Sequence, residues 1–362
     1  MTIAVHIEPL SRGKGSILKK SILLLAAQHP DDHFIFFINK GDKSLLQNKN
    51  CTPALISPSI KNNLLLYYWY NFKLPALLNR YNADAFINES PVCSFRADIP
   101  QYTVIKDIDF LSNSLKKIEP ILYKRKIFPT LVKKVAGLIV AHEASSKKIS
   151  LLYPVTLNKI YTIFPGFHED YQAIAQQDKE SIKSKYTGEK DYFTFFINPS
   201  NKSCLLPVLK AFSQFKKWQR SNMQLVVLTD HININNIIKD FNLYKYREDV
   251  RAIVYTGDKE SIKIIGSSYA LICGYPGLDK SNMAVKGMKC EVPVIFLNNE
   301  SPFKEAAIHI APDEKPIAES MMLLYKDEHY RENLIMEGRK YALQFSWENT
   351  AGALWNILAS KQ

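Results

Sequence analysis

Two short glycine-containing segments in the sequence could bind an anion. They are Arg12-Gly-Lys-Gly15 and Gly274-Tyr-Pro-Gly277. Glycine lets the backbone approach a bound group closely, so Gly13 and Gly15 could bring amide groups against phosphate or sugar oxygens. A plain tight turn is the alternative interpretation of the first segment, because two glycines alone do not define a phosphate site.

Each glycine segment follows a predicted strand and precedes a predicted helix. Residues 2–7 and 269–273 are short apolar runs, as a parallel strand covered on both faces requires. After the helices, further apolar runs begin at residues 34–38 and 294–297. The repeated order of strand, small-residue loop, helix and strand predicts a doubly wound α/β sheet, whose ligands bind at the carboxyl ends of the strands.

Length and composition limit the class of protein. A chain of 362 residues exceeds the roughly 250–300 at which a single core stops growing, so we expect two domains. No apolar run reaches the roughly 18–20 residues needed to cross a bilayer. The first strand begins without a positively charged leader, which indicates a cytoplasmic protein.

The cysteines are widely spaced and include no C-x-x-C pair. A zinc site or a disulfide framework is therefore not expected, and buried free thiols are. We also see no cluster of metal-ligating residues and predict no metal site. The five cysteines are Cys51, Cys93, Cys204, Cys273 and Cys290.

The formal net charge of +12 is compatible with nucleic acid, anionic lipid or a phosphorylated small molecule as a partner. Much of the excess charge lies in residues 116–134, where basic residues alternate with apolar ones such as Phe128 and Leu131. A solvated face and a segment on an anionic membrane are both open interpretations, although Pro120 and Pro129 interrupt any long helix. No recognised nucleic-acid module is present, so we expect no nucleic-acid partner.

The order of these elements and the motifs between them resembles the retaining GT-B glycosyltransferases of the family 4-like, or group 1, type. The resemblance covers essentially the whole chain. It is carried by the turn Cys290-Glu-Val-Pro293, the helical segment Val208-Leu-Lys-Ala-Phe212, Pro165-Gly166 and the closing segment Gln344-Phe-Ser-Trp347.

The resemblance implies the α/β GT-B fold, in which two Rossmann-like domains face each other across a cleft. An N-terminal acceptor domain would then occupy residues 1–168 and a C-terminal nucleotide-sugar donor domain residues 169–345. A C-terminal helix in residues 346–362 would cross back to the first domain.

The resemblance also implies site residues. Where the family has a histidine over the transferred sugar, this chain has Lys106, which is followed by Asp107, and we predict these two residues as catalytic. Lys202 and Ser203 occupy the positions of the family's pyrophosphate-binding cations, and the family's two glutamates are replaced by Leu278 and Lys286. The predicted donor-binding residues are Gly13, Gly15, Lys202, Ser203, Gly257, Lys280 and Lys286.

Two functions follow from these assignments. One is a hexosyltransferase-type enzyme that moves a sugar, with retention and without a metal or separate cofactor, from a nucleotide sugar to a polysaccharide, lipid-linked or other glycan acceptor. The other is a catalytically inactive homologue that binds carbohydrate or an active partner. The enzyme would be cytoplasmic, and residues 116–134 would place it on the inner face of the membrane if they bind anionic lipid.

Overall fold

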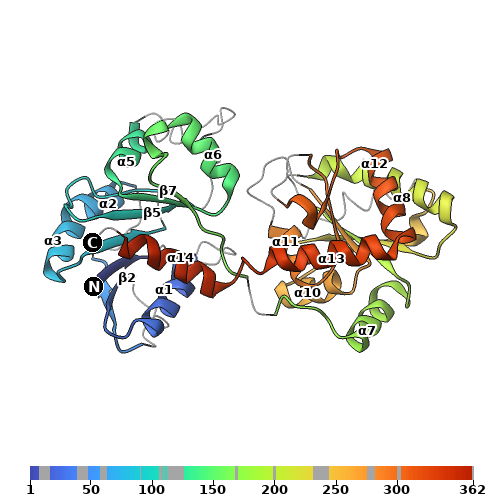
Figure 1. Cartoon of the computed structure of the whole chain (residues 1–362), viewed down its shortest axis with the longest axis horizontal. Helices are drawn as coiled ribbons and strands as arrows, with labels where there is room; N and C mark the ends of the chain where they lie inside the picture. The colour runs from blue at the N-terminus through green and yellow to red at the C-terminus, as the bar shows by residue number, and fades with distance from the viewer. Residues whose placement is uncertain are drawn as a thin grey trace. The chain divides into compact units, whose positions relative to one another are not determined.

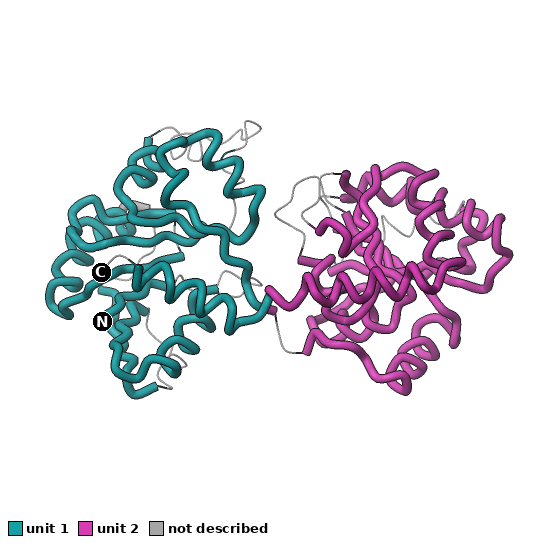
Figure 2. The backbone as a smooth tube through the Cα atoms, in the orientation of Figure 1, with its two compact units in different colours: residues 1–166, 345–362 teal, residues 167–344 magenta. Residues whose placement is uncertain are grey.

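The structure, a computed structural model, describes residues 1–7, 17–38, 48–57, 63–89, 91–105, 108, 111, 126–167, 170–198, 201–230, 244–274, 282–299 and 303–360. The chain forms two compact units (Figure 2). The first unit contains residues 1–166 and 345–362, and the second contains residues 167–344. Each unit is an α/β structure with its own parallel sheet, which confirms the predicted fold class.

The first unit is built on a seven-stranded sheet in the order β3-β2-β1-β4-β5-β6-β7. The chain adds strands on one side of β1 and then on the other, which is the doubly wound arrangement (Figure 1). The strands are β1 (Thr2–His6), β2 (His33–Ile38), β3 (Cys51–Leu55), β4 (Ala85–Asn88), β5 (Gln101–Ile105), β6 (Gly137–Val140) and β7 (Ile160–Thr162).

Helices cover both faces of this sheet, because alternate residues of a strand point to opposite faces. Ile3 and Val5 pack with α1 and α14, whereas Ala4 packs on the opposite face with Trp69 and α3. The helices are α1 (Ile17–Gln28), α2 (Asn63–Tyr68), α3 (Leu74–Arg80), α5 (Phe128–Lys134), α6 (Glu143–Leu152) and α14 (Trp347–Ala359), with a π-helical turn at Trp69–Lys73 and a 3₁₀ turn at Pro154–Thr156.

The second unit repeats the arrangement with six parallel strands in the order β10-β9-β8-β11-β12-β13. The central strands have buried side chains on both faces, as their continuous apolar sequences predicted. The strands are β8 (Tyr192–Phe196), β9 (Gln224–Thr229), β10 (Val250–Val254), β11 (Ala270–Cys273), β12 (Val294–Phe296) and β13 (Ile308–His309).

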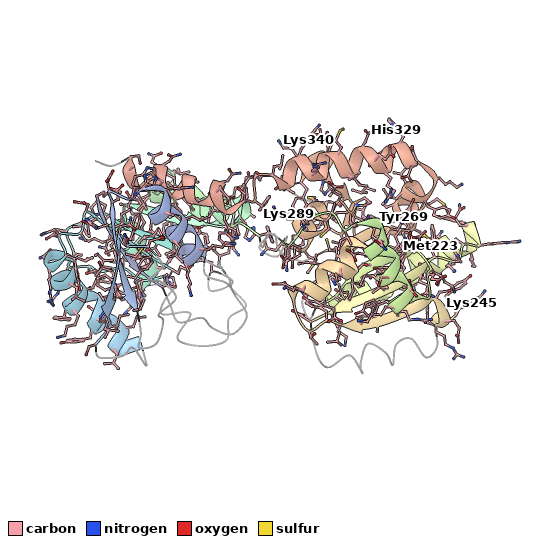
Figure 3. The ribbon with its side chains drawn as sticks, turned by 90° about the horizontal axis from the view of Figure 1, so that it is seen from below. Met223, Lys245, Tyr269, Lys289, His329 and Lys340 are labelled. Atoms are coloured by element: carbon pink, nitrogen blue, oxygen red, sulfur yellow. The ribbon has the colours of Figure 1, made fainter. Side chains whose placement is uncertain are left out.

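The helices of the second unit also lie on both faces of their sheet. One face is covered by α8 and α12, which share a core cluster with β8 and β9. Figure 3 shows α13 with its exposed residues His329 and Lys340. The helices are α7 (Gln176–Thr187), α8 (Leu205–Gln219), α10 (Asp258–Gly266), α11 (Asn282–Lys289), α12 (Glu314–Lys326) and α13 (Glu328–Ala342).

The cysteines match the prediction, because all five are buried and free. Among the described residues, no helix is both long enough and apolar enough to cross a membrane. Within that same part of the chain, no group of three or more histidine, cysteine and acidic residues could hold a metal ion.

Helix α14 belongs to the first unit and is fixed there at its start. The Ser346 hydroxyl accepts a hydrogen bond from the Asn349 amide at 3.0 Å, which caps the helix. The Thr350 hydroxyl donates to the Phe164 carbonyl at 2.8 Å, and Gly166 lies directly against Trp347. The last helix of the chain therefore completes the core of the first unit, to which it contributes the buried residue Leu354.

Two glycine substitutions should change stability in opposite directions. A Cβ atom at Gly166 would lie 2.6 Å from the Trp347 ring and backbone nitrogen, so we expect Gly166→Ala to lower the free energy of unfolding by about 1–3 kcal/mol. Gly352 lies within α14, where a Cβ atom would meet none of the described atoms within 4 Å. Gly352→Ala should therefore raise the free energy of unfolding by about 1 kcal/mol.

Denaturant unfolding of both variants beside the wild type measures the two effects. Equal changes for the two alanine variants would contradict the close approach of Gly166 to Trp347.

Candidate functional site

The second sheet has a topological switch point between β8 and β11. These strands are neighbours, but the chain continues from β8 toward β9 on one side and from β11 toward β12 on the other. In open parallel sheets, ligands bind at the carboxyl edge where the connections diverge in this way. The chain segments at the carboxyl ends of β8 and β11 therefore mark the candidate ligand site.

Asn201 joins these two segments. Its side-chain amide donates to the Phe196 carbonyl and to the Gly274 carbonyl, both at 2.9 Å, and its side-chain oxygen accepts from the Asn198 amide at 2.7 Å. The residue is completely buried. Sequence reasoning did not single out Asn201, although an asparagine between a strand and a helix is a known signal for a side chain that bonds to nearby backbone.

Lys202 and Ser203 lie beside Asn201, in a 3₁₀ turn that leads into α8. Both are exposed, whereas Asn201 and Cys204 on either side of them are buried. A helix N-terminus presents free backbone N–H groups and a partial positive charge, and an adjacent lysine adds a full charge. The arrangement could therefore bind a phosphate group.

Asp258, the first residue of α10, follows Gly257 in the chain and pairs with Lys286. The Lys286 ammonium lies 3.1 Å from Asp258 Oδ1 and 4.7 Å from the centre of the Tyr171 ring, and the Tyr171 hydroxyl donates to Asp258 Oδ1 at 2.8 Å. Burial and the hydrogen bond to Asp258 raise the pKa of Tyr171, which stays protonated. A nucleotide would thus compete with Asp258 for the Lys286 ammonium.

The other predicted site residues lie outside the described residues. They are Gly13, Gly15, Lys106, Asp107 and Lys280, together with Leu278 at the first of the two glutamate positions. The roles assigned to them stay predictions.

The first sheet has its own switch point, between β1 and β4, and buried polar side chains lie there. His6 ends β1, and its Nδ1 atom is 2.8 Å from the Tyr70 hydroxyl. Glu89 follows β4, and its Oε1 atom accepts from the Leu18 amide at 2.8 Å, in the first turn of α1. This hydrogen bond links the residue after β4 to the first turn of α1.

Burial controls the charge of His6. Only 1% of the residue is exposed, and desolvation lowers its pKa to about 4, so the imidazole is neutral at pH 7. Sequence reasoning missed both His6 and Glu89. The signal was a polar residue at the end of an apolar strand, but this signal does not tell whether the side chain is buried.

Comparison with known proteins identifies the fold. No protein-family model matches the sequence, and no curated protein matches it. Among solved structures, a glycosyltransferase from Rickettsia africae has 14% identity and a TM-score of 0.73, covering 99% of this chain and 98% of that chain. HepE from Anabaena in complex with UDP has 13% identity and a TM-score of 0.72, covering 99% of this chain and 100% of that chain.

The structure therefore has the GT-B fold of these glycosyltransferases, which confirms the resemblance at the level of fold. The fold also occurs in a Listeria monocytogenes protein that is provisionally described as a UDP-N-acetylglucosamine 2-epimerase. That protein has 11% identity and a TM-score of 0.59, covering 99% of this chain and 97% of that chain. The fold alone does not choose between these activities.

His6 should make the protein less stable in acid. Because its folded-state pKa of about 4 lies below the unfolded value, the unfolded chain binds more protons between these two pKa values, and stability falls as the pH decreases through that window. With an unfolded pKa of about 6.5, the loss from about pH 7.5 to about pH 5 is about 2 kcal/mol.

Unfolding free energies of the wild type and His6→Gln at the two pH values measure this difference. The variant should lose about 2 kcal/mol less than the wild type on acidification. His33→Gln, at an exposed histidine of the same sheet, is the matched control and should behave as the wild type does. An unchanged pH dependence in His6→Gln would contradict the buried neutral state.

Proposed function

We propose that this protein transfers a sugar from a nucleotide-sugar donor to a glycan acceptor, and that its second unit binds the donor. The observation that carries the proposal is the switch point of the second sheet. There, Asn201 links the ends of β8 and β11 through the carbonyls of Phe196 and Gly274, and Lys202 and Ser203 lie exposed next to the start of α8. Anabaena HepE, which has the same fold, has been solved with UDP and with UDP-glucose, and this supports a nucleotide-sugar donor.

In sugar transfer, the main contribution of the second unit would be to stabilise the leaving group. As the bond to the sugar breaks, negative charge develops on the departing nucleoside diphosphate, and fixed positive groups next to it lower the barrier. The Lys202 ammonium and the positive end of the α8 helix dipole are suited to this role. Ser203 can add a hydroxyl hydrogen bond to a phosphate oxygen.

The same proposal includes roles for individual residues, the stereochemistry of the reaction and the acceptor. We assign Lys106 and Asp107 to the transferred sugar, and Gly13, Gly15, Gly257 and Lys280 to the donor. The reaction would retain the anomeric configuration, and the acceptor would be a polysaccharide, a lipid-linked glycan or another glycan. For Lys286, the ion pair with Asp258 favours a role in positioning the start of α10, next to Gly257.

Calorimetric titration with UDP, GDP and ADP, followed by assays of donor turnover, tests the function. Binding of one diphosphate together with release of that diphosphate from its sugar conjugate supports transfer. Binding without turnover would indicate an inactive homologue. Conversion of the bound nucleotide sugar into its epimer would indicate an isomerase, and absence of binding to all three diphosphates would contradict the proposed donor site.

Lys202→Met should weaken binding of the diphosphate. The variant loses one charge-assisted hydrogen bond while keeping a similar side-chain volume, so we expect the dissociation constant to rise about tenfold. Lys217→Met is the matched control, because Lys217 is an exposed lysine in the last turn of the same helix. Equal affinities of the Lys202→Met and Lys217→Met variants for the diphosphate would show that Lys202 does not bind it.

Lys286→Met should have a smaller effect on the same titration. Its ammonium already pairs with Asp258, so we expect the dissociation constant to rise no more than about threefold. A loss as large as that in Lys202→Met would mean instead that the ion pair opens and that Lys286 binds the nucleotide, as the resemblance to the glycosyltransferases implies.

A further inference from the structure

Four aliphatic side chains project from the first unit where α6 leads into β7. Leu151 is 82% exposed, Leu157 64%, Val155 53% and Leu152 47%. We refer to these four residues as the apolar knob. Single exposed apolar residues are common on protein surfaces, but four within seven consecutive residues form a patch of the kind that marks an interaction site.

The apolar knob belongs to an ordered segment. Thr156 is completely buried, and its hydroxyl donates to the Tyr153 carbonyl at 2.8 Å. The Tyr153 ring packs on Phe128 of α5 with 5.1 Å between ring centroids, and the Leu157 amide donates to the Pro154 carbonyl at 3.1 Å. Because Tyr153 and Thr156 are held inward, their neighbours are held outward.

Lysines surround the apolar knob. On α6, Lys147 and Lys148 precede Leu151 and Leu152 by four residues each, which makes them neighbours on the helix surface. On α5, which lies beside α6 in Figure 1, Lys133 and Lys134 occupy the last turn. We refer to these four exposed lysines as the lysine rim.

Lys159 connects the residues that follow the apolar knob to the end of α5, where Lys133 and Lys134 of the lysine rim lie. Its ammonium donates to the carbonyls of Lys133 and Val135 at 3.2 and 3.0 Å, at the C-terminal end of α5. Residues 126–159 contain six lysines and a single acidic residue, Glu143. The surface around the knob is therefore strongly positive.

This surface differs from the one that the sequence suggested. Phe128 and Leu131, two of the apolar residues that gave residues 116–134 a membrane-like pattern, are completely buried in the core of the first unit. The described part of that segment, residues 126–134, contributes lysines to the surface and one exposed apolar side chain, Ile127. Residues 116–125 lie outside the described residues, and among the described residues of this region the larger exposed apolar group comes from residues 151–157.

We propose that the apolar knob inserts into the interface of an anionic lipid bilayer while the lysine rim binds the lipid headgroups. Aliphatic side chains without hydrogen-bonding groups match the acyl boundary, and each lysine near an anionic surface adds about 1 kcal/mol of attraction. A second copy of the chain fits less well, because a twofold contact would bring the two lysine rims together. The single sign of the charge favours the lipid surface.

The position of the knob leaves the carboxyl edge of the first sheet accessible. Helix α6 runs from the carboxyl end of β6 to the amino end of β7, so residues 151–157 lie at the amino edge of the first sheet. His6 and Asn88 end their strands at the opposite edge. A bilayer at the amino edge would therefore leave the carboxyl edge of this sheet free for ligands.

Co-sedimentation of the full chain with lipid vesicles tests the proposal. Vesicles of phosphatidylglycerol mixed with phosphatidylcholine should bind the wild type, and vesicles of phosphatidylcholine alone should bind it at least about tenfold less, because they lack anionic headgroups. The double variant Leu151→Ser, Leu157→Ser should lower binding to the anionic vesicles about tenfold, since it removes apolar groups from the knob.

The matched control is the double variant Leu323→Ser, Leu343→Ser, which changes two exposed leucines of the second unit and should bind as the wild type does. Replacing the four rim lysines with glutamine should abolish the preference for anionic vesicles. Wild-type binding by the Leu151→Ser, Leu157→Ser variant would overturn the proposal.

A dimeric wild type that this variant converts to a monomer, with no vesicle binding by either, would also overturn the proposal. Such a result would assign the knob to contact between copies of the chain. None of these outcomes depends on nucleotide binding, so the proposed function is tested separately.

Discussion

The side-chain amide of Asn201 is the interaction on which the candidate nucleotide site depends. The connections from β8 and β11 lead to opposite sides of the sheet, and a hydrogen-bonding group between the two strand ends holds them together. A single buried side chain does this by donating to carbonyls on both strand ends while its oxygen accepts from Asn198. Because these hydrogen bonds are made, burial of the Asn201 amide costs little free energy. Lys202 and Ser203 follow Asn201 directly in the chain, so the position of Asn201 determines theirs.

The two sheets place different chemistry at their carboxyl edges. The first sheet has a neutral imidazole, His6, and a carboxylate, Glu89, both nearly completely buried. The second has an exposed lysine at the start of a long helix, and among its described candidate cations Lys286 is paired with Asp258. Among the described residues, Lys202 and the start of α8 suit the second edge to an anion, because cations and helix N-termini favour anions.

Much of the fold could be predicted from the sequence, because buried parallel strands are continuous apolar runs and the loops between them contain turn residues. The strand at residues 269–273, the helix before Pro293 and the strand that begins at Val294 correspond to β11, α11 and β12. The return of the last helix could be predicted only through the resemblance to a known family.

The site was harder to predict, because its decisive contacts join residues that are far apart in the sequence. Asn201 reaches Gly274, 73 positions later, and Glu89 reaches Leu18, 71 positions earlier. Counting along a motif placed Lys286 in the site, but it could not show that Asp258, 28 positions earlier, would pair with its ammonium. Local patterns do not determine whether a polar side chain is buried or which partner it meets.

The docking of α14 against α1 has a consequence for synthesis of the protein. Ala351, Leu354, Ile357 and Leu358 belong to the core that β1, β2 and α1 also form, so this core lacks a helix until the ribosome has made the last residues. The second unit, residues 167–344, is contiguous and can close first. The core of the N-terminal unit is therefore completed only after residues 347–359 have been made, and until then the apolar face of α1 is a surface that chaperones can bind.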